Sequence, residues 1–97
     1  MEKIYISGKI TGLDEHEAFK MFDEAENELI IQGYEVVNPM NIEHNHDKSW
    51  LNYMRTDIKA LMECDCVYAL NNWHYSRGAK IEVNLAKKLG MKVIYQK

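Results

Sequence analysis

Two patterns of apolar residues alternate along the chain. Short apolar runs, typical of buried strands, occupy residues 4–6, 34–37, 66–70 and 92–95. Between these runs, apolar residues recur every three or four positions, as they do on one face of a helix. The helical stripes consist of Phe19, Phe22, Ala25 and Leu29, then Leu51, Met54, Ile58 and Leu61, and finally Ala79, Ile81, Leu85, Ala86 and Leu89.

The ends of these predicted helices carry capping signals. Asp14 and Ser49 stand where a helix N-cap is expected, and Glu17 completes the spacing of a capping box. Gly33 and Gly90 follow the last apolar positions of the first and third helices, as C-terminal glycines commonly do. Strands and helices therefore alternate along the whole chain, beginning and ending with a strand.

This alternation predicts an α/β fold with a parallel sheet and right-handed crossovers. We expect a flavodoxin-like or Rossmann-like three-layer sandwich, in which four strands, or five, lie in the order 2-1-3-4. Residues 1–97 are expected to form one domain, because a chain of 97 residues can bury one modest core.

The charge and hydropathy of the chain limit its partners. The net charge is −3, the pI is about 5.8, and the basic residues are interleaved with acidic ones. A nucleic-acid polymer is therefore not expected as the main partner, whereas a small anionic ligand is compatible. No apolar run approaches the roughly 20 residues of a membrane span, and the N-terminus leads directly into a strand instead of a signal peptide. We expect a cytoplasmic protein without a membrane partner.

The cysteines and histidines do not predict a metal site. Cys64 and Cys66 are separated by one residue, so a disulfide between them would be strained, and we expect reduced thiols in or near the core. Together with His44 and His46 they could supply four zinc ligands, but their spacing matches no usual zinc pattern. Strand alternation is also expected to point both thiols to one face. The histidines are better interpreted as part of a solvated loop that covers a pocket.

The fold class predicts where a ligand binds. In an open parallel sheet, ligands lie beyond the carboxyl ends of the strands, where the strand order reverses. For the expected order, residues 7–12 and 71–78 meet at this point, and both loops are rich in small, hydrogen-bonding residues that suit an anion. They do not form an ATP-binding P-loop, because Ile10 follows Lys9 and Ile4 occupies the place of the first glycine.

Two acidic residues fall on the apolar faces of predicted helices. Glu82 lies three residues before Leu85 and four before Ala86, and Asp57 lies three residues after Met54. An unpaired inward carboxylate is costly, so each acid needs a partner, a proton or a chemical role. We expect the first turn of the helix to favour ionised Glu82, while burial raises the pKa of the other acid. Such a pair suits glycosidic-bond cleavage, in which a carboxylate attacks the anomeric carbon and an acid protonates the leaving group.

Each candidate residue also has a structural interpretation. Trp73 and Tyr75 are compatible with stacking on a nucleobase, but equally with rim packing or a subunit contact. Ser7, Gly8 and Ser76 are compatible with phosphate or ribose contacts, but also with turns. Glu82 can alternatively cap local N–H groups. Ion pairs are another alternative for both acids. Glu82 can pair with Lys80 or Lys9, and Asp57 can pair with Arg55 or Lys59.

Segments spread over nearly the whole chain match a known family. They are Tyr5-Ile6-Ser7-Gly8-Lys9-Ile10, Asn38-Pro39, Asp57-Ile58 leading to Cys64-Asp65-Cys66-Val67, and Ser76-Arg77-Gly78-Ala79-Lys80-Ile81-Glu82. Together they resemble the nucleoside 2-deoxyribosyltransferase superfamily. The resemblance is closest to a branch of small bacterial and phage proteins, and the loops are similar to those of the deoxynucleoside 5′-monophosphate N-glycosidases.

The resemblance implies a role for each matching residue. Glu82 takes the position of the nucleophile and Asp57 that of the aspartate that handles the proton of the base. Classical transferases have an acid six positions before the nucleophile, where this chain has Ser76 like the monophosphate hydrolases, so a phosphate-tolerant pocket is implied. Classical transferases have further C-terminal segments after the last strand, where this sequence ends, so we expect cleavage more than transfer between bases. The implied substrate-binding residues are Tyr5, Ser7, Gly8, Ile10, Trp73, Ser76, Arg77 and Gly78.

Three functions are therefore considered. The first is an N-glycosidase or deoxyribosyltransferase that acts on a deoxynucleoside or its monophosphate without a metal or organic cofactor. The second is a nucleotide-binding or sensing module that keeps the pocket but lacks efficient chemistry. The third is a small structural or regulatory oligomer with Trp73 and Tyr75 as interface anchors. We also expect a homodimer or larger assembly, because Trp50, Trp73 and Tyr75 are predicted to be exposed around the strand-end loops.

Overall fold

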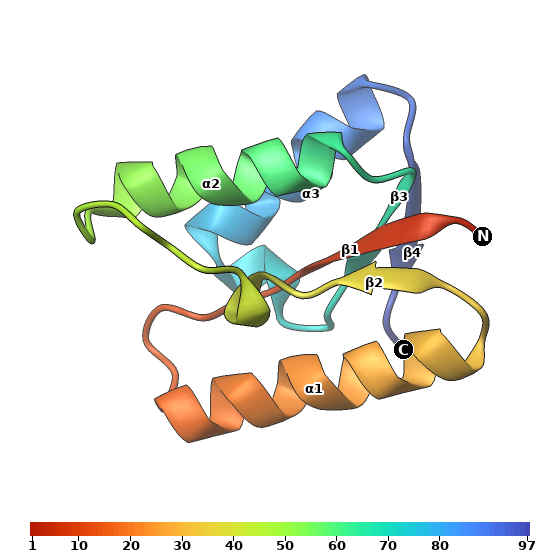
Figure 1. Cartoon of the computed structure of the whole chain (residues 1–97), viewed down its shortest axis with the longest axis horizontal. Coiled ribbons are helices and arrows are strands. Elements are labelled where there is room, and N and C mark those ends of the chain that lie inside the picture. Colours follow the sequence, from red (N-terminus) through yellow and green to blue (C-terminus); the bar gives the residue numbers. More distant parts are fainter.

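The computed structural model describes residues 1–97 as a parallel four-stranded sheet covered by helices on both faces (Figure 1). The strands lie in the order β2-β1-β3-β4 and each is parallel to its neighbours. The predicted fold class and strand order are confirmed, with four strands and no fifth. The strands are β1 (Lys3–Ser7), β2 (Glu35–Val37), β3 (Cys66–Ala69) and β4 (Lys92–Tyr95).

Three α-helices form the outer layers of the sandwich. In Figure 1, α1 (Glu15–Ile31) lies along one face of the sheet, and α2 (Trp50–Met62) and α3 (Arg77–Lys88) lie along the other. Each helix begins with a side-chain cap that accepts a hydrogen bond from a backbone N–H of its first turn. None of the helices is both long enough and apolar enough to cross a membrane. The N-caps of α1, α2 and α3 are Asp14, Ser49 and Ser76.

Alternation along β1 divides the core between the two faces. Ile4 and Ile6 are fully buried on the α1 face, where they pack in a cluster with Phe22. Tyr5 points to the opposite face, into the cluster that includes Val83 of α3. Burial of each such apolar side chain stabilises the fold by about 1.5–3 kcal/mol relative to an exposed one. The same alternation carries Ser7, the last residue of β1, to the α3 side of the sheet.

The buried faces of the helices differ from the predicted stripes. Ala79, Glu82, Val83 and Ala86 are the buried residues of α3, at the spacing of one helix face. The inward position of Glu82 was predicted correctly, but the buried face includes Val83, which the predicted stripe left out, and excludes two apolar residues that the stripe contained. The exposed members of the predicted stripes are Phe19 (48%), Leu51 (53%), Ile81 (39%) and Leu89 (50%).

The cysteines are free and buried, as predicted, but they do not share a face. Cys66 lies in β3 and packs on the α1 side, whereas Cys64 precedes the strand and packs on the α2 and α3 side. The expectation of one face was wrong because strand alternation does not extend to Cys64. Burial raises the pKa of Cys64 to about 11, so its thiol stays protonated at neutral pH.

The loops that follow β1 and β3 are tied to each other. The backbone N–H of Leu70 donates to the carbonyl oxygen of Ser7 at 2.8 Å, and the N–H of Lys9 donates to Oδ1 of Asn72 at 3.0 Å. Gly8 allows this close approach, since a Cβ atom there would lie 2.5 Å from Cδ1 of Leu70. The two loops thus reach the carboxyl edge of the sheet as one unit, where the ligand site was predicted.

Candidate functional site

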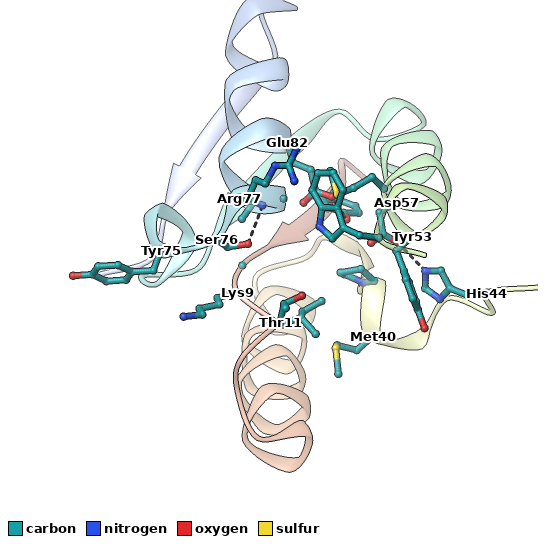
Figure 2. A pocket seen from close by; sticks show the side chains of 18 of the residues that line it. Lys9, Thr11, Met40, His44, Tyr53, Asp57, Tyr75, Ser76, Arg77 and Glu82 are labelled. Carbon is teal, nitrogen blue, oxygen red and sulfur yellow. Dashed lines mark hydrogen bonds and ion pairs between the residues drawn. The ribbon is translucent and has the colours of Figure 1, made fainter. Parts of the chain in front are cut away.

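A cavity of about 740 Å³ opens at this edge, between the loop after β1 and the N-terminal halves of α2 and α3. Figure 2 shows Ser76 and Lys9 on one side of it and Tyr53 and His44 on the other. The loop after β1 and the 39–44 segment contribute Gly8, Lys9, Ile10, Thr11, Pro39, Met40 and His44. The helix α2, the turn that precedes α3 and the first half of α3 contribute Trp50, Tyr53, Met54, Asp57, Tyr75, Ser76, Arg77, Gly78, Ala79 and Glu82.

Glu82 lies on the floor of the cavity with two hydroxyl partners. The residue is only 5% exposed. Ser7 donates a hydrogen bond from Oγ to Oε1 of Glu82 at 2.8 Å, and Tyr5 donates from its hydroxyl to Oε2 at 3.0 Å. The donors come from one face of β1, and α3 packs directly over that face. Both oxygens of the carboxylate are therefore held in place, and the alternatives of pairing with a lysine or capping local N–H groups are excluded.

The pKa of Glu82 is raised to about 7. Burial is the main cause, and the nearby charge of Asp57 acts in the same direction, while the hydrogen bonds from Ser7 and Tyr5 lower the pKa. We had predicted that the free N–H groups of the first helical turn would favour the ionised form. That expectation was wrong, because α3 begins at Arg77 and Glu82 lies in the second turn, beyond those groups.

Asp57 lies beside Glu82 and forms a contact with a histidine. Nε2 of His44 lies 3.0 Å from Oδ1 of Asp57, with both side chains nearly buried at 13% and 12% exposure. Burial raises the pKa of Asp57, and the contact with His44 opposes this shift. The predicted alternative of a surface ion pair is wrong, since Arg55 instead donates to Asn52. Asp57 and His44 can together hold a proton at the wall of the cavity.

The start of α3 forms the side of the cavity opposite His44. Ser76 caps the helix by accepting a hydrogen bond from the N–H of Ala79 at 3.1 Å, and its own hydroxyl proton stays available to donate. The guanidinium carbon of Arg77 lies 4.1 Å from the ring centroid of Trp50. A Cβ atom on Gly78 would lie 3.0 Å from Sδ of Met54, so glycine lets α3 begin close to α2.

The remaining predicted contact residues divide into two groups. Tyr5, Gly8 and Ile10 line the cavity, and Ser7 lies directly beneath it through its bond to Glu82. Trp73 does not line the cavity. Its ring lies 5.8 Å from that of Tyr95 and under the ammonium group of Lys87, which is the rim packing considered as an alternative. Tyr75 contributes to the rim but points away from the cavity in Figure 2.

Several lining residues were not among the predicted contact residues, notably Trp50, Tyr53, His44 and Lys9. Trp50 had a readable signal, because it precedes Met54 and Asp57 by four and seven residues, at the spacing of one helix face. His44 lies in a segment without periodicity, so only its general placement in a loop over the pocket was predictable.

No group of three or more His, Cys, Asp or Glu side chains is arranged to hold a metal ion. The fold also separates the cysteines from the histidines that could together have supplied zinc ligands. Cys66 packs beneath the sheet against α1, whereas His44 and His46 lie together against the ring of Tyr53 near α2.

Sequence comparison assigns the chain to a family. The profile of the family described as Domain of unknown function (DUF4406) matches residues 2–95, which is almost the entire chain. The chain belongs to this family. No curated protein matches the sequence of this DUF4406 chain.

Structural comparison relates the DUF4406 chain to a solved enzyme. It superimposes on the 2-deoxyribosyltransferase of Bacillus psychrosaccharolyticus, described as a biocatalyst for nucleoside synthesis, with a TM-score of 0.73 and 20% sequence identity. The match covers 96% of this chain and 70% of the transferase. The resemblance to the nucleoside 2-deoxyribosyltransferase superfamily is thus confirmed at the level of the fold.

Proposed function

We propose that this protein cleaves, or transfers, the N-glycosidic bond of a deoxynucleoside or deoxynucleoside 5′-monophosphate through a covalent intermediate on Glu82. One observation carries the proposal. A nearly buried carboxylate lies on the floor of a cavity of about 740 Å³, with both oxygens held by the hydroxyls of Tyr5 and Ser7. A carboxylate aimed in this way is suited to attack the anomeric carbon of a sugar.

The first step forms a bond from an oxygen of Glu82 to C1′ of the deoxyribose. The C1′–N bond breaks at the same time, and its electron pair leaves with the nitrogen of the base. That nitrogen, or another ring atom of the base, then takes a proton. We assign the proton to the pair formed by Asp57 and His44, because both side chains are at the cavity wall and burial raises the pKa of Asp57.

The second step releases the sugar from Glu82. Water attacks C1′, the bond from C1′ to the glutamate oxygen breaks, and the proton of the water passes to the pair formed by Asp57 and His44. If a second base enters in place of water, the outcome is transfer. Either acceptor regenerates the carboxylate of Glu82 and the protonated pair, so no metal or organic cofactor takes part in the proposed cycle.

A 5′-phosphate is expected on the side of the cavity formed by the start of α3. Ser76 can donate a hydrogen bond, Arg77 supplies positive charge, and Lys9 lies on the same side in Figure 2. The backbone N–H groups at the helix start also favour an anion. These features support the monophosphate as the preferred substrate.

The test is an incubation of the purified protein with the four deoxynucleosides and their 5′-monophosphates, followed by chromatography for free base. Wild-type protein should release base, and Glu82→Gln should lower the rate by several orders of magnitude. Glu24→Gln makes the same change on the exposed surface of α1 and should act like the wild type. Binding without base release from any substrate would instead indicate a nucleotide-binding module.

A comparison of substrates with poor and with activated leaving groups tests the role of Asp57. Asp57→Asn should slow cleavage of substrates with poor leaving groups much more than cleavage of activated ones, because only a poor leaving group needs the proton. Equal losses on both kinds of substrate would make Asp57 a positioning residue instead.

A further inference from the structure

Trp50 is the first residue of α2 and lies in the wall of the cavity. Met54 and Asp57 follow it by four and seven residues, so the three side chains share one face of the helix. Trp50 remains 36% exposed although its ring packs against the start of α3. A large, partly open ring therefore stands on the same helix face as the proposed proton donor.

Contacts from the start of α3 hold the ring of Trp50. Arg77 places its guanidinium group over the ring, with Cζ 4.1 Å from the centroid. The backbone of Gly78 is also close, since a Cβ atom there would lie 3.9 Å from Nε1 of Trp50. An indole ring has two faces and Arg77 covers one of them, so the opposite face can accept a second flat partner.

The other aromatic ring that α2 contributes to the cavity is already in contact with protein. The ring of Tyr53 lies 4.8 Å from that of His44 and 5.1 Å from that of His46. None of the side chains that line the cavity is Asn or Gln, whose amides offer separate donor and acceptor groups to the polar edge of a base, and Asp57 is already assigned to the proton of the base. A base in this cavity is therefore expected to be held mainly through its flat face.

We propose that Trp50, held by Arg77, is the platform on which the nucleobase of the substrate stacks. The inference rests on the proposed function, because protonation by Asp57 requires the base to lie along the face of α2 that carries Trp50. Stacking accepts every base, so the cavity should discriminate weakly among the four. Arg77 can serve both ends of a nucleotide, with its planar face on Trp50 and its N–H edge toward the phosphate.

Fluorescence tests whether a base reaches Trp50. The chain has two tryptophans, and Trp73 lies outside the cavity, so Trp73→Phe leaves Trp50 as the sole indole reporter. In a Glu82→Gln background, which blocks turnover, each of the four deoxynucleoside 5′-monophosphates should quench this fluorescence. In the matched protein with Trp50→Phe, the emission of Trp73 should stay unchanged. Quenching of Trp73 alone, or no binding of any nucleotide, would overturn the proposal.

Calorimetry separates the base contact from contacts to the sugar and phosphate. Trp50→Ala should weaken binding of the monophosphates roughly 10- to 100-fold, as loss of a base–aromatic stack does, and Trp50→Phe should restore most of the affinity. Deoxyribose 5-phosphate has no base, so Trp50→Ala should weaken its binding far less, and only through the freed side chain of Arg77. An equal loss for deoxyribose 5-phosphate would overturn the proposal, as would unchanged monophosphate affinity in a variant whose circular dichroism is native.

Arg77→Lys tests the positioning role of the guanidinium group. Lysine keeps the charge for a phosphate but loses the planar stack, so binding of free deoxynucleosides should weaken several-fold. If only monophosphate binding weakens, Arg77 does not position Trp50. Failure of the proposed function would give a different result. Nucleotides would then quench the fluorescence of Trp50 in a Trp73→Phe protein that keeps Glu82, but this protein would release no base.

Discussion

The carboxylate of Glu82 has a pKa of about 7, because burial disfavours its charge, whereas an ordinary glutamate has a value of 4.5. Between these values the folded protein binds the proton more tightly than the unfolded chain does. The contribution of Glu82 to the free energy of unfolding is therefore greatest at low pH and is lost as the pH rises from about 4.5 to about 7. The residue that carries the proposed chemistry thus destabilises the fold at neutral and alkaline pH.

Glu82→Gln is expected to stabilise the protein at pH 8. Glutamine cannot ionise, and the hydroxyls of Tyr5 and Ser7 can rotate to bond its amide. The free energy of unfolding should increase by up to about 3 kcal/mol at pH 8 and by less than about 1 kcal/mol at pH 5. Urea unfolding of both proteins at the two pH values measures it. A variant that is equally or less stable than the wild type at pH 8 would contradict the burial of an ionising Glu82.

Tyr5→Phe is expected to shift the pH dependence of catalysis. The tyrosine hydroxyl donates to Glu82 and so favours the ionised, nucleophilic form, and phenylalanine keeps the packing but loses this bond. The activity should rise with pH through about 7 in the wild type and about one pH unit higher in the variant. A pH profile of kcat/KM measures the shift. A uniform loss at every pH would indicate only a structural role for the hydroxyl.

At the scale of elements, Ser76 at the start of α3 has two roles, as the cap of the helix and as a proposed contact of the phosphate. Ser76 caps the helix, and aspartate is an equally good cap, so Ser76→Asp should preserve α3 while adding a negative charge at the proposed phosphate site. We expect the variant to lose the preference of the wild type for monophosphates over free nucleosides, which we place at about 5- to 150-fold in kcat/KM.

The control for this substitution is available in the same chain. Ser49→Asp makes the same change at the N-cap of α2, at a residue that does not line the cavity, and should leave the preference unchanged. A wild-type protein that prefers the free nucleoside would show that the start of α3 contacts ribose or base instead of phosphate.

The elements and their order could be predicted because they depend on local patterns. Asp14 and Ser49 cap helices where expected, and alternating strands and helices imply the parallel sheet. The buried face of α3 was predicted less well. The spacing within α3 places Glu82 on that face, but its partners Tyr5 and Ser7, whose hydroxyls lie opposite it, are far away in the sequence. No pattern within α3 alone contains this information.

The candidate site could likewise be predicted where it depends on local spacing, but not where it depends on contacts between distant residues. The acids Glu82 and Asp57 stood out as charges on apolar faces, and the structure places both in one cavity. His44 was predicted only as part of a loop over the pocket, because its contact with Asp57 depends on the path of an irregular segment. Trp73 was weighed as a base contact from its place after β3, but the 3-10 turn Trp73–Tyr75 directs its ring toward Tyr95.

At the scale of the whole molecule, we predict a homodimer or larger assembly. Apolar side chains remain exposed beside the cavity, with Tyr75 of its rim at 70% and Leu51, which follows Trp50 in the chain, at 53%. A second copy that covers them would also narrow the cavity. Light scattering at micromolar concentration should give at least twice the chain mass of 11.4 kDa. A monomer of that mass with full activity would contradict this prediction.

The central claim, that Glu82 becomes covalently bonded to the sugar, is tested most directly by mass spectrometry of the protein during turnover. Rapid mixing with a deoxynucleoside 5′-monophosphate, followed by acid quenching, should yield protein that carries one deoxyribose phosphate. Peptide mapping should place the adduct on Glu82, and Glu82→Gln should form none. Base release without any adduct and at an undiminished rate in Glu82→Gln, or an adduct at another residue, would contradict the account.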